Sequence, residues 1–195
     1  HVAFVQAHRR CLGRLLGKAL DNFFARPATK DRILRVTSFE VRGPFNALLR
    51  SPELCDRVQK VGEYLRYNSS IPARLNEFAI LIAARYWNAQ YEWYAHHIHA
   101  MKGGLKPEVA ADLAQGKRPA NMQEDEALVY DFCTELHRDK QVSDKTLEAV
   151  TKKFGERGVV DLIGVSGYYT LVSMVLNVDK HPLPDGVAPP LPSLK

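Results

Sequence analysis

The sequence predicts an all-α protein, a helical bundle with a single domain. Apolar residues recur at three- and four-residue spacing through most of the chain, which is the period of an amphipathic helix. Proline, serine and glycine stand where these segments begin and end. We find no stretch with the strict apolar–polar alternation that is typical of a half-buried strand. The 195 residues are enough to bury one core.

The first forty residues predict a basic helix followed by a linker. Residues 2–24 carry apolar side chains at helical spacing, and four cations but no acid precede Asp21. A start that is rich in arginine and poor in acids is typical of a targeting segment or of a helix that packs on the body or on a neighbouring subunit. We favour the packing helix and expect Pro27 to end it.

The main helical domain is expected to span residues 41–186. It opens with a turn at Gly43-Pro44 and a short helical turn over residues 45–49. A longer helix then begins at Ser51-Pro52-Glu53, where a capping serine precedes a proline and an acid, and it continues to about Tyr67.

Residues 71–105 form the part of the chain around which the rest is organised. We expect two helices here, joined by a short turn. The first helix is almost wholly apolar but contains one carboxylate, Glu77. The second carries Glu92, His96 and His99, whose i, i+4, i+7 spacing places all three on one helix face. These acids and imidazoles are the part of the sequence that is typical of a catalytic site.

The boundaries of this pair follow from capping residues. We expect the turn at Trp87 and Asn88, with Asn88 as the N-cap of the second helix. Gly103 is the expected C′ residue, with Leu105 as its hydrophobic contact.

Four further helices are predicted, followed by an irregular tail. They are expected over residues 107–114, 123–138, 143–154 and 159–178. Gly155 to Gly158 is expected to separate the last two. The tail after His181, which ends in the proline-rich residues 187–195, cannot form regular structure.

Glu77, Glu92 and His96 are the candidate catalytic residues. A carboxylate orients an imidazole one turn away and stabilises its cation, and burial would raise the pKa of Glu77. The alternatives are a solvated Glu92–His96 pair and an ion pair of Glu77 with Arg74. His99 makes a metal site conceivable, but there is no H-x-x-x-H or H-E-x-x-H motif, so we expect no metal.

Charge and cysteine content indicate which partners and which cellular compartment to expect. Residues 1–50 hold ten Lys/Arg and three Asp/Glu, whereas residues 51–195 hold seventeen and nineteen, so the basic character belongs to the N-terminal segment. Without basic–aromatic interleaving we expect no nucleic acid partner, and without an apolar run of about 18 residues we expect no membrane span. The three cysteines, Cys11, Cys55 and Cys133, imply no disulfide framework, which favours a cytoplasmic protein with buried thiols.

Three segments resemble the carboxymuconolactone decarboxylase family, which includes the alkyl hydroperoxide reductase D-type peroxidases. They are RGPFNALLRSPEL (42–54), the helix pair of residues 71–105 and LNVDKHPLPDG (176–186). The resemblance spans about residues 41–186. It implies the all-helical fold of alkyl hydroperoxide reductase D and a homo-oligomer, a trimer or a hexamer.

The peroxidase branch of that family uses a Glu, a C-x-x-C pair and a His. The resemblance places the Glu at Glu77 and the His at His96, but the two cysteine positions fall on Ala89 and Glu92. A peroxidatic mechanism needs a thiolate and a resolving thiol. We therefore do not expect thiol peroxidase activity.

The decarboxylase branch needs no cofactor and acts on a small lactone that carries carboxylates. The resemblance implies His96 as general acid or oxyanion donor, Glu92 as its orienting group and Glu77 as a proton shuttle. We expect Tyr91, Arg85 and His99 to contact substrate; Arg42 and Arg50 are further candidate cations. A lyase of aromatic catabolism is the first hypothesis, and a non-catalytic oligomeric binding or assembly protein is the second.

Overall fold

The computed structural model describes residues 43–193, so the predicted N-terminal basic helix and Arg42 lie outside the described residues. The chain divides into two compact units, His1–Glu63 and Tyr64–Lys195. Their boundary falls inside a helix and does not coincide with the predicted boundary at residue 40. All the side chains discussed below as a site belong to the second unit.

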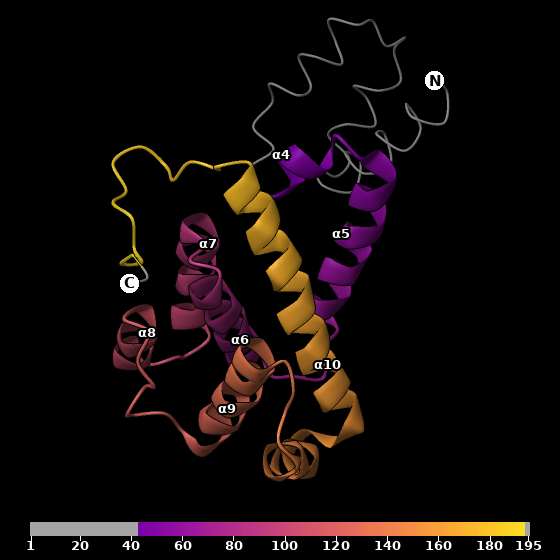
Figure 1. Ribbon diagram of the computed structural model, residues 1–195, viewed down its shortest axis with the longest axis vertical. Coiled ribbons are helices and arrows are strands. Elements are labelled where there is room, and N and C mark those ends of the chain that lie inside the picture. The colour runs from indigo at the N-terminus through magenta and orange to yellow at the C-terminus, as the bar shows by residue number, and fades with distance from the viewer. Residues whose placement is uncertain (1–42, 194–195) are drawn as a thin grey trace, which may run out of the picture. The chain divides into compact units, whose positions relative to one another are not determined.

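The described residues are all-helical, without a strand, which confirms the predicted class. The helices are α4 (Phe45–Leu48), α5 (Pro52–Tyr67), α6 (Ala73–Tyr86), α7 (Gln90–Lys102), α8 (Pro107–Ala114), α9 (Glu124–Asp139) and α10 (Asp144–Val178) (Figure 1). The tail after Lys180 has no regular secondary structure, as its prolines predict.

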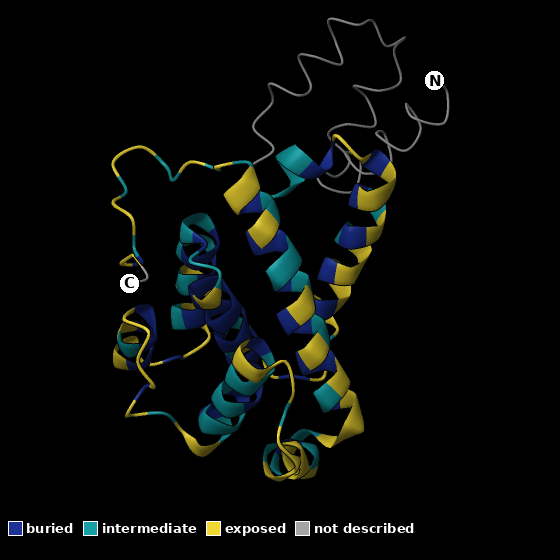
Figure 2. Cartoon of the chain, in the orientation of Figure 1, coloured by how far each residue is buried: buried dark blue, intermediate teal, exposed yellow. Residues whose placement is uncertain are grey.

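Helix α6 is the centre of the second unit. It packs against α7, α8, α9 and α10, and ten of its residues, from Leu75 to Arg85, are buried (Figure 2). The core around it includes Phe78, Phe132 and Leu162 from three different helices. Because α6 is apolar on nearly every side, burying it between helices is the arrangement that removes most of its surface from water.

Two predicted helix ends are wrong by one residue. Ala89, not Asn88, is the N-cap of α7, because Asn88 has φ 48° and belongs to the turn. At the other end the left-handed residue is Gly104, at φ 93°, and not Gly103. The amide of Leu105 donates to the Ala100 carbonyl at 3.0 Å, so the predicted Schellman-type ending is present, one residue later.

The predicted break between two helices is confirmed at Gly155, but it is shorter than the expected segment from Gly155 to Gly158. Helix α10 continues through this region, and only Gly155, at φ 72° and ψ 172°, leaves the helical conformation. The residues after it are helical again, which produces a kink rather than a loop.

Helix α10 is long and apolar enough to cross a membrane by length and composition alone, which the sequence analysis did not anticipate. Its inner face is part of the core, through residues such as Leu162, Val165 and Val172. Its outer face is exposed at Val160, Ile163, Met174 and Val178.

The two described cysteines differ in their bonding state. Cys133 is free and buried, as predicted. Cys55 is also buried but is disulfide-bonded. The expectation of unpaired thiols, and the argument from it for a reducing compartment, therefore fails at Cys55.

Candidate functional site

Glu77, Glu92 and His96 converge in the structure; we call them the Glu–His–Glu site. Helix α6 supplies Glu77, and α7 supplies the other two. The connection between these helices is short, and the amide of Ala89 donates to the carbonyl of Ala84 at 2.8 Å, which folds α7 back onto α6. Buried apolar residues on both helices then hold the pair together.

The imidazole of His96 lies between the two carboxylates. Its Nδ1 is 2.6 Å from Oε2 of Glu77, a hydrogen bond between the two helices. Its Nε2 is 3.3 Å from Oε1 of Glu92, within ion-pair range but without the alignment of a hydrogen bond. The predicted alternative pairing of Glu77 with Arg74 is not made, because Arg74 binds Asp125 and Glu126 of α9 instead.

Burial sets the protonation of this site. Glu92 is 3% exposed and His96 is 7% exposed. Removal from water raises the pKa of Glu92 to about 7, against the opposing attraction of His96 and Arg66. Oε1 of Glu92 accepts no hydrogen bond from the described residues. At neutral pH this carboxyl is therefore divided between its two protonation states.

Three residues near the site were not predicted from the sequence. The ring of Tyr169 lies edge-on to His96, with centroids 5.0 Å apart, and Tyr168 contacts Tyr169 in the same way. Burial and the Glu92 charge raise the pKa of both tyrosines, that of Tyr168 to about 12, so both hydroxyls stay protonated. Arg66 of α5 acts electrostatically on Glu92 and on both tyrosines.

The predicted substrate-contacting residues lie apart from one another. The His99 ring is 6.0 Å from the His96 ring, next to the site. The ring of Tyr91 packs edge-on against His181 of the tail at 4.4 Å. The Arg85 guanidinium donates to Asn88 at 3.0 Å and to the Pro192 carbonyl at 3.1 Å, so this cation binds the turn and the tail.

Arg50 was a further candidate cation, and the sequence predicted no metal site. Arg50 belongs to the first unit, where its guanidinium donates to the Asn46 carbonyl at 3.3 Å. Within residues 43–193 we find no group of three or more His, Cys, Asp or Glu side chains arranged to hold a metal ion.

A cavity of about 350 Å³ lies along a different part of α7. It is lined by Trp93, Tyr94, His97, Ile98, Pro107, Ala110, Ala111, Ala114 and Pro190, and not by His96. Its walls are mainly apolar and come from α7, α8 and the tail. This cavity is therefore not the place where the acid and base groups meet.

No family model, curated protein or solved structure matches the chain.

Proposed function

We propose that this protein is a cofactor-independent acid–base enzyme of the carboxymuconolactone decarboxylase type, acting on a small carboxylated lactone or a related aromatic catabolite. One observation carries the proposal: the imidazole of His96 is held between two carboxylates, and one of them, Glu92, has a pKa of about 7. A group that titrates near neutrality is matched to donating and accepting protons there.

The two carboxylates have different roles in the proposed mechanism. Glu77 accepts the proton of Nδ1, which orients the ring and leaves Nε2 as the atom that exchanges a proton. Glu92 faces Nε2 and, with its raised pKa, can return a proton to it. A carboxylate that orients the ring and a carboxyl that exchanges protons with it are what general acid–base catalysis requires.

The proposed reaction is a decarboxylation in which these groups transfer protons. A substrate carboxylate leaves as carbon dioxide, and the electron pair of the broken C–C bond remains on the substrate as a dienolate. The protonated Nε2 of His96 then gives its proton to carbon, and Glu92 reprotonates the imidazole. The buried, still protonated hydroxyl of Tyr169 is a candidate donor to the dienolate oxygen.

Arg66 is the cation that best fits an anionic substrate. It already acts on Glu92 and Tyr168 electrostatically, whereas Arg85 is bound to the turn and the tail. A guanidinium that acts on a buried acid–base site can also attract a carboxylate and orient it.

Turnover of carboxymuconolactone, followed optically, tests the proposal. We expect His96→Ala and Glu92→Gln to lower the rate by roughly 10²–10⁴-fold, the usual contribution of a general acid or base. His97→Ala is the matched control, since it removes an imidazole from the next position of α7 and should leave the rate unchanged. Equal rates in all four proteins would remove His96 and Glu92 from the mechanism.

A non-catalytic oligomeric relative is the second candidate. The observation that favours it is the position of the 350 Å³ cavity, which His96 does not line. In such a protein, the Glu77–His96 hydrogen bond would only join α6 to α7. Absence of turnover together with a large loss of stability in His96→Ala would support this reading.

Thiol peroxidase activity has less support. Ala89 and Glu92 occupy the two cysteine positions, and burial raises the pKa of Cys133 to about 12, which keeps this thiol protonated and unreactive. Peroxide consumption that iodoacetamide abolishes would contradict this assignment.

A further inference from the structure

The outer face of α10 carries an exposed apolar stripe. Four of its residues are well exposed: Val160 (65%), Ile163 (48%), Met174 (40%) and Val178 (84%). Together with Gly167 and Leu171 they recur at intervals of three and four residues, so all six lie on one helix face; we call them the α10 stripe. No charged residue interrupts the helix between Asp161 and Asp179.

A surface of this kind is costly to leave in water. An amphipathic helix normally has charged or polar residues on its outer face, and contiguous exposed apolar residues mark a contact surface. The inner face of the same helix is already used by the core, through residues such as Val165 and Val172. The exposed residues of the stripe therefore form a second apolar face that the core of the second unit does not bury.

Gly167 lies at the centre of the stripe. A Cβ atom added there would meet nothing within 4 Å, so the fold of the chain itself does not require glycine at this position. In a helix interior, glycine is less favourable than alanine. A glycine on an exposed helix face is explained if another backbone approaches closely at this point.

The stripe is arranged symmetrically about Gly167. The helical segment after the Gly155 kink runs from residue 156 to residue 178, and Gly167 is its midpoint. In an antiparallel pair of these segments that crosses at Gly167, Val160 faces Met174 and Ile163 faces Leu171. Every apolar residue except Val178, at the end of the helix, then meets another apolar residue of the stripe.

Charges at the ends favour the same arrangement. Glu156 lies at the start of the segment, and Lys180 lies just beyond its end; both are exposed. Antiparallel pairing brings Glu156 of one chain near Lys180 of the other, twice. Parallel pairing would instead bring Glu156 near Glu156, which is unfavourable.

We propose that the α10 stripe binds the same stripe of a second copy of this chain, in an antiparallel pair with a two-fold axis at Gly167. An interface of this type is isologous, because the same surface is used on both sides. A hexamer with two-fold axes contains such a contact, whereas a simple trimer does not. The proposal is independent of the chemistry assigned to His96.

Light scattering after size-exclusion chromatography of the full chain tests the proposal. We expect the wild type at micromolar concentration to have a mass that is an even multiple of 22.0 kDa. Gly167→Leu places a bulky side chain at the crossing point but in open space within one chain, so it should halve that mass. Leu147→Lys changes an exposed apolar residue of α10 before the kink and is the matched control, with no expected change.

A charge-swap pair tests the antiparallel alignment. Val160→Lys alone should halve the mass, and adding Met174→Glu should restore it, because each lysine then faces a glutamate of the other chain. A double variant that stays at half mass would contradict the alignment, since parallel pairing opposes Lys to Lys.

Two other results would overturn the proposal. One is an even-numbered assembly that neither Gly167→Leu nor Val160→Lys affects, which would place the interface elsewhere. The other is a monomeric wild type that Val160→Lys destabilises towards heat, which would show that another segment of the same chain, such as residues 1–42, covers the stripe.

Discussion

Oε2 of Glu77 lies 2.6 Å from Nδ1 of His96, and this hydrogen bond joins the two helices of the central pair. The same imidazole faces Glu92 with its other nitrogen. In the proposed mechanism, Glu77 orients the ring and Glu92, with a pKa of about 7, exchanges protons with it.

Stability should depend on pH through Glu92. Its pKa is about 7 in the folded protein and near 4.5 in the unfolded chain, so folding takes up a proton between these values. The stabilising contribution is complete below pH 4.5 and is lost as the pH rises through about 7. At about 1.4 kcal/mol per pKa unit, the loss amounts to about 3 kcal/mol.

Glu92→Gln removes this titration. We expect the variant to match the wild type at pH 4.5 and to exceed its free energy of unfolding by up to about 3 kcal/mol at pH 8. Urea unfolding at both pH values measures the difference. Two parallel pH profiles would show that Glu92 is not the titrating group.

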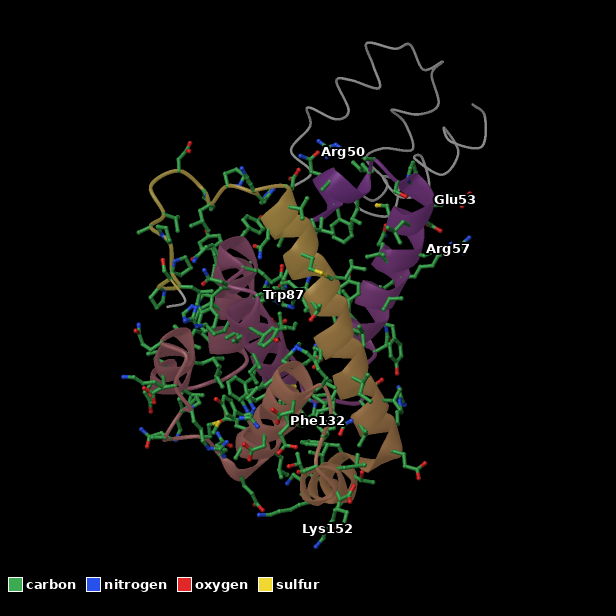
Figure 3. The ribbon with its side chains drawn as sticks, viewed as in Figure 1. Arg50, Glu53, Arg57, Trp87, Phe132 and Lys152 are labelled. Atoms are coloured by element: carbon green, nitrogen blue, oxygen red, sulfur yellow. The ribbon has the colours of Figure 1, made fainter. Side chains whose placement is uncertain are left out.

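Arg66→Met should shift the proton exchange of the site to higher pH. The Arg66 charge holds the pKa of Glu92 below the value that burial alone would produce, so removing the charge raises it. The pH–rate profile should move upward, and the KM for an anionic substrate should increase. Lys152→Met is the control, because Lys152 projects from the lower end of the protein into solvent (Figure 3); an equal shift in this control would point to net charge as the cause.

Arg74 should be required for stability. It pairs with Glu126, which is fully buried and caps α9 through the amide of Gln123, and with Asp125 at 2.8 Å. Arg74→Met leaves the Glu126 charge buried without its partner, and we expect a loss of about 3–5 kcal/mol.

The same substitution at an exposed ion pair provides the control for Arg74. Arg118 pairs with Asp131 at the surface, so Arg118→Met should cost less than about 1 kcal/mol. Adding Glu126→Gln to Arg74→Met should recover part of the loss, since the unpaired charge is then removed. Additive effects in this cycle would contradict the pairing.

His137 should limit stability in acid. Burial, assisted by Lys140, lowers its pKa to about 4, so the folded protein holds this imidazole neutral. Its stabilising contribution is present above pH 6.5 and is lost as the pH falls towards 4. His137→Phe keeps the stacking on Tyr86 and removes Nε2, for which residues 43–193 provide no hydrogen-bond partner. The variant should make acid unfolding less steep. Chemical unfolding at pH 7 and pH 4 measures this; an unchanged slope would assign the acid sensitivity to other groups.

The helices could be predicted from the sequence because apolar spacing and capping residues are local signals. The ends of α7 were misplaced by one residue because Gly103 and Gly104 are adjacent, and only the backbone angle shows which of them is left-handed. The break expected from Gly155 to Gly158 is present but is confined to Gly155. Gly158 lies inside the helix, where a Cβ atom would clash with the side chain of Phe154, so this glycine serves close packing and not a turn.

The site was predictable in part. The Glu92–His96 pair follows from spacing on one helix, whereas the contact of His96 with Glu77 was expected only through the family resemblance. Tyr169 and Arg66 had no sequence signal, since their positions depend on how α10 and the last turn of α5 pack in the second unit. The hydrogen bonds of the Arg85 guanidinium to the turn and the tail also had no sequence signal.

Titration of the Glu92 side-chain carboxyl carbon by ¹³C NMR tests the central claim most directly. Comparison with the spectrum of Glu92→Gln identifies the signal. A midpoint near pH 7, which rises further in Arg66→Met, is the result we predict. A midpoint near 4.5 would show an ordinary ionised carboxylate and would contradict the assignment of Glu92 as the group that exchanges protons with His96.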